Sequence, residues 1–561
     1  MKQPILRSVL WSAYGDALGF ISERRNRPNL PSQYSSRRRN TSLIPWTRRI
    51  GGQFGVNIQL PAGCYSDDTQ LRLATFRSIR GNGEFDVEVF GRVELPVWVS
   101  YALGAGRGST TAAESLRRQQ IQWNWNFYDS KLSRYVDGGG NGAAMRVQPH
   151  VWCANRHRAK HSILRDIIRN TITTHGHMRA IVGAAFHAMC LWNVMLAMQV
   201  PDPSDWLAIM DELKELADLI RSDEDLSLYW LPHWESVTGQ TVESALHKVL
   251  NELKDDIDTA RRMLENSHSD YEAGKSYSRL AEEIGCLKNE TVGSAPKTAL
   301  LASYLSYAFA KRTHEGIIES ANLIGSDTDT IATMAGAIMG VVAESEPPEE
   351  VRDLDYFKKV AEALSKMSDD EEVPSHPYPD LISWKPPASQ IDTMGKLGDR
   401  WVLQGLGEAI PIDDPVTKEG KNPTIWQWFR LDFGQTVLVK RRQEVKVLSN
   451  ESLLVKPPLL DTGVQPSLIA KGTSDSGPKD ALDEQGNPNR SQAVDQQGKQ
   501  YESIDIATDR VISSGFQPEI VGSMLMKLAE QEDGIEKSIA FAAIVAKARQ
   551  ARIKREKRGS S

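Results

Sequence analysis

Cysteine is scarce in this sequence, and its cysteines are far apart. Only four of the 561 residues are cysteines, and no two of them form a C-x-x-C pair. This spacing argues against a disulfide framework and against the usual thiolate zinc sites, so we expect reduced thiols in a cytoplasmic protein. The four residues are Cys64, Cys153, Cys190 and Cys286.

Long apolar segments and an excess of positive charge are also missing. We find no apolar run of the roughly 20 residues that a membrane-spanning helix needs, so we expect no membrane partner. The N-terminal segment MKQPILRSVLWSAYGDALGF has no small-residue cleavage site, and we interpret it as the first core helix. The net charge of −6 does not favour nucleic acid as a partner of the whole chain.

The chain is long enough for roughly two to four structural units. Apolar residues recur at spacings of three and four through most of the first two thirds, which predicts one all-α domain over 1–370. Residues rich in Trp, Val, Ile and Phe with partial alternation then predict a small β-containing module over 380–455. Ser, Gly, Asp, Gln and Pro dominate 456–500, which predicts a disordered linker.

Residues 501–561 return to helix-compatible sequence and form the predicted helical C-terminal region. From Lys547 to Arg558 there are seven basic residues and one acidic residue. Such an end is typical of a solvated helix whose positive charges favour its own dipole. Contact with nucleic acid or with another acidic partner is the alternative.

Two acidic clusters stand at predicted helix starts. The sequence GSDTDT at 325–330 precedes a long apolar helix, and YSDDTQ at 65–70 precedes another helical segment. Ser, Asp and Thr are good N-cap residues, but one such residue is enough to cap a helix. Carboxylates and hydroxyls are the ligands that Mg²⁺ prefers. If the two helix starts converge, they supply the donors of a two-metal site.

Three further segments carry polar or glycine-rich patterns. GDALG at 15–19 is followed by Glu23. DGGGNG at 137–142 is rich in glycine, so its backbone amides could come close to a ligand, or the segment could simply form a turn. THGHMR at 174–179 contains two histidines, but no cysteine or third histidine lies near them in sequence. For these histidines, helix capping or hydrogen bonding to a ligand is more plausible than a zinc site.

Together these five segments resemble the ADP-ribosylglycohydrolase family, which includes the dinitrogenase-reductase-activating glycohydrolase and the ADP-ribosyl-arginine and ADP-ribosyl-serine hydrolases. GDALG with Glu23, YSDDTQ, GNGAAMR, THGHMRA and GSDTDTIA occur in the family's order over about residues 5–345. The sequence departs from the common pattern at Ser66, where threonine is frequent, and at Met178, where proline is frequent. The hydroxyl is kept at position 66, so metal binding is expected to survive.

The resemblance implies a site as well as a fold. It implies an all-α catalytic domain with two Mg²⁺ ions at its centre, Mn²⁺ being an alternative ion. The implied metal ligands are Ser66, Asp67, Asp68, Asp327, Asp329 and Thr330. Glu23 and Asp68 are the implied catalytic carboxylates. Asn141, Gly142 and His175 are the implied contacts to ADP-ribose.

The function implied by the resemblance is Mg²⁺-dependent hydrolysis of the bond between C1″ of ADP-ribose and a modified protein or small molecule. An ADP-ribose-binding protein or scaffold with little turnover is one alternative. A hydrolase that the basic tail directs to ADP-ribosylated nucleic acid is another. The acceptor, whether arginine, serine, an ester or a nucleobase, stays open because the loops that would select it carry no diagnostic motif.

Overall fold

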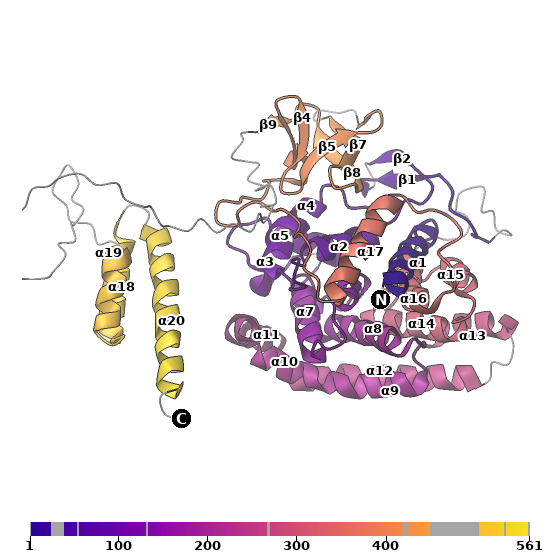
Figure 1. Ribbon diagram of the computed structural model, residues 1–561, viewed down its shortest axis with the longest axis horizontal. Helices are drawn as coiled ribbons and strands as arrows, with labels where there is room; N and C mark the ends of the chain where they lie inside the picture. Colours follow the sequence, from indigo (N-terminus) through magenta and orange to yellow (C-terminus); the bar gives the residue numbers. More distant parts are fainter. Residues whose placement is uncertain are drawn as a thin grey trace, which may run out of the picture. The chain divides into compact units, whose positions relative to one another are not determined.

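The structure is a computed structural model of the chain. It describes residues 2–23, 39–52, 55–130, 133–265, 270–418, 423–448, 504–531 and 534–558. Residues 1–462 and 463–561 form two compact units, and each is described by itself. The linker predicted over 456–500 lies outside the described residues. In the first unit a small sheet lies on one side of a large helical body (Figure 1).

Helices dominate the first unit, which confirms the helical fold class that the sequence predicts. The helices of eight or more residues are α1 (Lys2–Phe20), α2 (Asp67–Arg77), α5 (Arg107–Ser115), α7 (Lys160–Ile172), α8 (Met178–Ala197), α9 (Pro203–Glu212), α11 (Leu231–Thr238), α12 (Val242–Glu265), α13 (Asp270–Glu283), α14 (Ala295–Ala308), α15 (Thr313–Ala321), α16 (Thr328–Val342) and α17 (Leu354–Ser368). Shorter helices are α3 (Val87–Val89), α4 (Leu95–Trp98), α6 (Gln148–Trp152) and α10 (Leu216–Ser222).

Helix α8 is the central apolar helix of this unit. It packs against α7, α12, α14 and α16. By length and composition alone it could cross a membrane, so the expectation that no segment of the chain reaches that length was wrong. Its most apolar stretch is 83% buried inside the helical body, which is the pattern of a core helix.

Helices α1 and α16 run antiparallel with their backbones in contact. A Cβ atom on Gly15 would lie 2.4 Å from the carbonyl oxygen of Ala332, and one on Gly336 would lie 2.4 Å from that of Trp11. Only glycine allows this approach, since any side chain would overlap the opposite backbone. The hydroxyl of Thr333 also donates to the carbonyl oxygen of Ser12 at 2.7 Å. The GDALG motif is therefore a packing motif that fixes α1 against α16.

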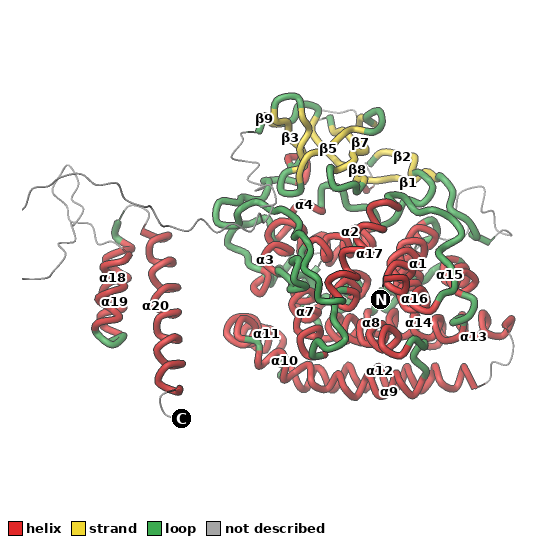
Figure 2. Tube along the Cα trace, in the orientation of Figure 1, coloured by secondary structure: helices red, strands yellow, loops and turns green. Residues whose placement is uncertain are grey.

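In the part of the chain that the structure describes, nine strands form two sheets, and the strands are yellow in Figure 2. A two-stranded antiparallel hairpin, β1 (Trp46–Ile50) with β2 (Val56–Leu60), lies within the part of the chain predicted to be all-α. The sequence analysis missed this hairpin. The second sheet, here called the sheet module, has the order β6-β7-β5-β4-β3-β9, with β8 paired to β7. Its strands are β3 (Met394–Leu397), β4 (Arg400–Leu403), β5 (Gly407–Pro411), β6 (Val416–Lys418), β7 (Thr424–Leu431), β8 (Thr436–Arg442) and β9 (Lys446–Val447).

The sheet module shares its core with the helical body. Phe429 and Val437 of the sheet belong to the same buried apolar cluster as Leu71 of α2 and Trp98 of α4. The predicted β segment is thus part of the compact unit that carries the helices. Packing of this kind restricts how the sheet moves relative to α2.

A buried ion pair lies at the same junction. The guanidinium of Arg77 on α2 donates to both carboxylate oxygens of Glu94, at 2.7 and 2.8 Å, and both side chains are fully buried. Arg77 also donates to the side-chain oxygen of Gln435 in the sheet module at 2.6 Å. The hydroxyl of Tyr378 donates to Glu94 at 2.5 Å. These bonds satisfy the two charges and tie α2 to the sheet.

The described residues of the second unit form three helices, which confirms the helical C-terminal region that the sequence predicts. They are α18 (Ile504–Ser513), α19 (Pro518–Ala529) and α20 (Gly534–Arg558). Their small core consists of Ala507, Val511, Met524, Leu528, Phe541 and Val545. The predicted basic segment forms the last turns of α20.

The buried pair yields a stability prediction. Arg77→Met should lower the free energy of unfolding by about 3–5 kcal/mol, because it leaves the Glu94 carboxylate buried without its cation. Arg80→Met is the matched control, since 58% of the Arg80 side chain is exposed and ion pairs of exposed residues contribute about 0–1 kcal/mol. Urea unfolding followed by circular dichroism measures both. Equal losses of unfolding free energy in the two variants would contradict the stabilising role given to the buried Arg77–Glu94 pair.

Candidate active site

The start of α2 projects two aspartates that capping does not require. Ser66 is the N-cap residue, and its hydroxyl oxygen accepts a hydrogen bond from the backbone N–H of Asp68 at 3.2 Å. This is the capping role that the sequence analysis left open, and one serine performs it. Asp67 and Asp68 occupy the first turn, and both side chains are buried. Capping by Ser66 therefore does not account for these two carboxylates.

Asp16 of α1 fixes the position of this helix start. Its two carboxylate oxygens accept the backbone N–H groups of Ser66 and Thr69, each at 2.9 Å. Burial raises the pKa of Asp16 above its ordinary value. These hydrogen bonds and the nearby Arg72 offset only part of that increase. The side chain is fully buried beneath α2. Asp16 thus fixes the backbone that carries the acidic residues and does not line the pocket itself.

The start of α16 presents the second acidic group. Asp327 is in the N-cap position, yet its side chain makes no capping hydrogen bond. It accepts a hydrogen bond from the side-chain amide of Asn141 at 3.0 Å instead. Asp329 and Thr330 follow in the first turn and are buried. Capping alone therefore does not explain the aspartates of GSDTDT.

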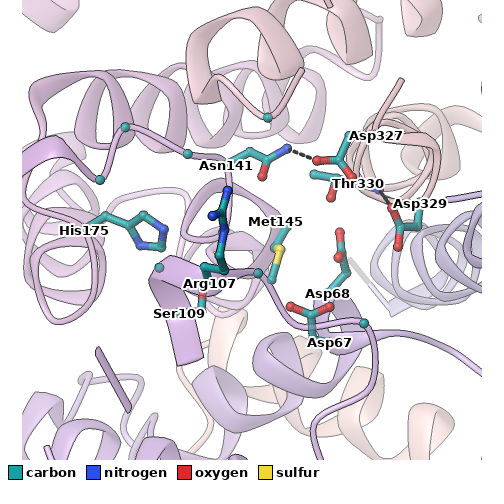
Figure 3. A pocket seen from close by; sticks show the side chains of 18 of the residues that line it. Asp67, Asp68, Arg107, Ser109, Asn141, Met145, His175, Asp327, Asp329 and Thr330 are labelled. Carbon is teal, nitrogen blue, oxygen red and sulfur yellow. Dashed lines mark hydrogen bonds between the residues drawn. The ribbon is translucent and has the colours of Figure 1, made fainter. Parts of the chain in front are cut away.

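The two helix starts meet at one pocket of about 290 Å³. Figure 3 shows Asp67 and Asp68 facing Asp329 and Thr330, with Asn141 bonded to Asp327 and His175 on the opposite side. Every residue predicted for the site lines this pocket except Ser66, which lies directly before Asp67 at the N-cap. The lining residues among them are Glu23, Asp67, Asp68, Asn141, Gly142, His175, Asp327, Asp329 and Thr330.

We call Glu23, Asp67, Asp68, Asp327 and Asp329 the acidic cluster. Burial, followed by the neighbouring carboxylates, raises the pKa of both Asp68 and Asp329 well above the ordinary value. One oxygen of Asp68, Oδ1, is buried and has no hydrogen-bond partner among the described residues. Buried carboxylates that repel one another need a compensating positive charge.

The donors of the acidic cluster fit a hard divalent cation. One carboxylate oxygen each from Glu23, Asp327 and Asp329 lie within 4.8 Å of one another. The set consists of oxygen donors, with the hydroxyl of Thr330 in addition, and this is the ligand chemistry of Mg²⁺ and Mn²⁺. The unpartnered oxygen of Asp68 points to the same conclusion. The cluster therefore could hold a metal, and its chemistry alone does not identify which ion.

A glycine loop, residues 138–142, forms the other side of the pocket. A Cβ atom on Gly142 would lie 2.7 Å from Oγ of Ser109 and 3.0 Å from Cε1 of His175, so only glycine fits there. Burial lowers the pKa of His175 to about 3, and its Nδ1 is 2.7 Å from the Thr174 hydroxyl. His175 is thus a neutral hydrogen-bonding group at neutral pH.

The second histidine of THGHMR has a structural role. The ring Nδ1 of His177 accepts the backbone N–H of Arg179 at 3.0 Å and caps the start of α8. Helix capping is one of the two roles that the sequence analysis preferred to a zinc site for these histidines. The motif therefore divides its histidines between the pocket and the helix cap.

The sequence analysis missed one wall of the pocket. Residues Gly104, Gly106, Arg107, Gly108 and Ser109 line it around the start of α5. Arg107 is exposed and is a cation on a pocket wall that otherwise carries acids and glycines. The signal was present as the glycine-rich segment GAGRGS, which has the same character as DGGGNG.

The support that Asp16 gives to α2 can be tested. Asp16→Asn should weaken Mn²⁺ binding about 10–100-fold, because an amide cannot accept both N–H groups that orient Ser66 and the following aspartates. Asp202→Asn is the control, since Asp202 also caps a helix with two hydrogen bonds but lies at α9. Calorimetric titration with Mn²⁺ measures the change. Equal affinities in wild type and Asp16→Asn would rule out this support.

The raised pKa of Asp329 predicts that this carboxylate lowers stability without metal, although it is needed for metal binding. A carboxyl group whose pKa is raised by folding destabilises the folded state as the pH rises above its unfolded value. Without metal at pH 7, Asp329→Asn should therefore raise Tm by about 2 °C or more. The same variant should lose the increase in Tm that Mg²⁺ gives wild type.

Glu362→Gln is the control for this experiment, because Glu362 is an exposed carboxylate on α17. Its Tm should stay within about 1 °C of wild type with and without Mg²⁺. Differential scanning calorimetry in EDTA and in Mg²⁺ makes the comparison. A lower Tm for metal-free Asp329→Asn would show that the carboxylate stabilises the fold and would contradict the charge argument.

Comparison with known proteins identifies the family of the chain. The family model described as ADP-ribosylglycohydrolase matches residues 2–374. The chain is similar to a solved structure titled "ADP-ribosylglycohydrolase-related protein complex", with 22% identity and a TM-score of 0.39, over 65% of this chain and 98% of that one. A comparison with curated proteins found no match. From the family match over most of its first unit, the chain belongs to the ADP-ribosylglycohydrolase family.

Proposed function

We propose that this protein is a Mg²⁺-dependent hydrolase that removes ADP-ribose from a modified acceptor by cleaving the bond at C1″. The observation that carries the proposal is the convergence of two acidic helix starts on one pocket, opposite a glycine loop. Family membership supports the same reaction class. A pocket with only a structural purpose would have little reason to gather five buried carboxylates, of which Asp68 and Asp329 have pKa values raised well above the ordinary value.

The acidic cluster would hold the metal. Asp67 and Asp68 from α2, and Asp327, Asp329 and Thr330 from α16, are the proposed ligands, with Ser66 joining through its hydroxyl. When bound, two Mg²⁺ ions would supply Lewis-acid polarisation of the ribose hydroxyls and of the bond at C1″. Mn²⁺ is an alternative with the same ligand preference.

The remaining lining residues would bind and orient the ADP-ribose. Gly140 and Gly142 of the glycine loop place no side chain between the backbone and the pocket, so a diphosphate could approach the backbone closely there. Asn141 and Gly142 belong to this loop, and Ser109 lies beside it. Neutral His175 can donate or accept one hydrogen bond without adding charge. This arrangement directs the distal ribose toward the acidic cluster.

Proton transfer would fall to Glu23 or Asp68. Cleavage passes through an oxocarbenium-like state, and water attacks C1″ as a carboxylate takes its proton. We favour Glu23, because the aspartates of the two helix starts are the proposed ligands and are poor proton acceptors once metal engages them, whereas Glu23 would lie beside the ions without being a ligand. The bond at C1″ would break with its electron pair going to the leaving group, which would take up the proton that Glu23 received from the attacking water. The loop residues that select this acceptor decide the linkage that is cleaved.

The four thiols are consistent with a reducing environment. All four cysteines are buried and form no disulfide. We accordingly propose a cytoplasmic location for the protein.

Release of free ADP-ribose tests the proposed activity. Wild type should release ADP-ribose from at least one member of a panel that contains arginine-linked, serine-linked, O-acetyl and nucleic-acid-linked ADP-ribose. Asp329→Ala, or removal of Mg²⁺, should reduce this rate by about 100-fold or more. The preferred substrate names the linkage. Tight calorimetric binding of ADP-ribose without release from any substrate would instead favour a binding protein or scaffold.

The basic end of α20 motivates the second candidate, a hydrolase directed to nucleic acid. In this case the intact chain should bind single-stranded nucleic acid with an affinity that falls steeply with salt, and a chain ending at residue 462 should not. Equal binding by both chains, or none at low salt, would remove this candidate.

A further inference from the structure

An arginine outside the family motifs reaches the acidic cluster. Arg48 is the middle residue of β1, and its Nη2 donates to Oε2 of Glu23 at 2.9 Å. The Glu23 side chain is 7% exposed and that of Arg48 is 20% exposed, so water screens this pair only weakly. Nothing in GDALG or in the two acidic motifs indicates this contact, because Arg48 belongs to a hairpin that the sequence pattern did not predict.

The surroundings of Arg48 fix its guanidinium in place. Its Cζ lies 4.3 Å from the centre of the Phe20 ring and 5.8 Å from that of Trp46. Its second terminal nitrogen, Nη1, is buried and has no hydrogen-bond partner among the described residues. A cation in this position is oriented by aromatic rings and directs its charge toward the carboxylate of Glu23.

Glu23 needs such a partner because of its neighbours. Its carboxylate lies within 4.8 Å of those of Asp327 and Asp329, and like charges at this distance repel one another. Glu23 is among the causes that raise the pKa of Asp329. Glu23 lies in the turn that follows α1, and the positive charge of Arg48 offsets this repulsion there.

The sheet module supports the hairpin that carries Arg48. Trp46 and Ile58 of the hairpin lie in one buried apolar cluster with Trp426, Trp428 and Leu438 of the sheet module. The hairpin and the sheet lie side by side in the ribbon of Figure 1 and in the tube of Figure 2. At the turn, a Cβ on Gly51 would lie 3.2 Å from the Trp426 ring.

A second connection joins the sheet module to the other side of the site. Asp353 accepts hydrogen bonds from the hydroxyl of Tyr65 at 2.7 Å and from the backbone N–H of Thr436 at 2.8 Å. Tyr65 directly precedes Ser66, the N-cap residue of α2. The sheet module is thus packed or hydrogen-bonded to segments on both sides of the acidic cluster.

We propose that Arg48 is a positioning residue for Glu23, and that the sheet module acts in the reaction by holding the hairpin that carries Arg48. Arg48 keeps the Glu23 carboxylate, and its negative charge, beside the cluster where a cation would bind. The part of this inference that concerns catalysis rests on the proposed hydrolase function. The part that concerns charge and metal affinity does not.

The test compares Arg48→Met and Arg48→Lys with Arg49→Met. Methionine keeps the apolar stem of Arg48 and removes its charge, whereas lysine keeps the charge. Arg49 is the matched control, because it is the adjacent arginine on β1 and is exposed. Each variant is assayed for ADP-ribose release with the best substrate of the panel and for Mn²⁺ affinity by calorimetry. Tm is recorded for each to confirm that the variant folds.

Arg48→Met should lower kcat about tenfold or more and change KM by less than about threefold, because it displaces a proton acceptor and leaves the glycine loop intact. It should also weaken Mn²⁺ binding by about fivefold, since the negative charge of Glu23 would no longer be held beside Asp327 and Asp329. Arg48→Lys should recover most of both effects. Arg49→Met should keep both quantities within about twofold of wild type, because solvent screens its charge.

Recovery by lysine and an unchanged Tm separate positioning from simple support of the fold. Equal losses in Arg48→Met and Arg48→Lys, together with a lower Tm in both, would mean that Arg48 only stabilises the hairpin, and this would overturn the proposal. Unchanged kcat would overturn it as well. If wild type releases no ADP-ribose from any substrate, the proposed hydrolase function fails, and Mn²⁺ affinity alone then decides the charge part of the proposal.

The role of the sheet module is tested by combining Trp426→Ala with Arg48→Met. Trp426→Ala should lower kcat in the wild-type background. It should change kcat by less than about twofold when Arg48 is already methionine, because the sheet would act through Arg48. Losses that simply multiply in the double variant would show that the sheet affects the site by another route, and this would contradict the second half of the proposal.

Discussion

The backbone contact between α1 and α16 is the constraint on which the site depends. Gly15 and Gly19 of α1, with Gly336 and Gly340 of α16, leave no space for a side chain between the two helices. Because the helices run antiparallel, this contact brings the end of α1 to the start of α16. Asp16 then reaches beneath α2, and Glu23 reaches the carboxylates of α16. A packing motif thus determines where the chemical groups meet.

The acidic cluster costs stability in the absence of metal, and the surrounding structure offsets that cost. Several buried carboxylates share one small pocket, and burial together with mutual repulsion raises the pKa of Asp68 and Asp329. Hydrogen bonds from Asn141 and the ion pair with Arg48 each stabilise one member of the cluster. A divalent cation would neutralise the remainder, and this links metal affinity directly to folding free energy.

Much of this arrangement could be predicted from the sequence, because its signals are local. Helical periodicity predicted the helical body, and surplus aspartates at two helix starts predicted an acidic pocket. The hairpin was missed because the five residues WTRRI have polar side chains at three consecutive positions and show no clear alternation. Arg48 and Arg107 were missed for a related reason, since their importance comes from tertiary contacts and not from a sequence pattern. The close packing of the sheet module on α2 could not be read from composition.

Diffraction from crystals soaked in Mn²⁺, with anomalous differences measured at the manganese edge, tests the central claim most directly. The account predicts manganese between the start of α2 and the start of α16, with carboxylate oxygens of Asp68 and Asp329 at about 2.1–2.3 Å. Manganese that binds only elsewhere on the protein, or a pocket that stays without manganese at millimolar concentration, would contradict it. The acidic cluster would then be a structural feature without a catalytic metal.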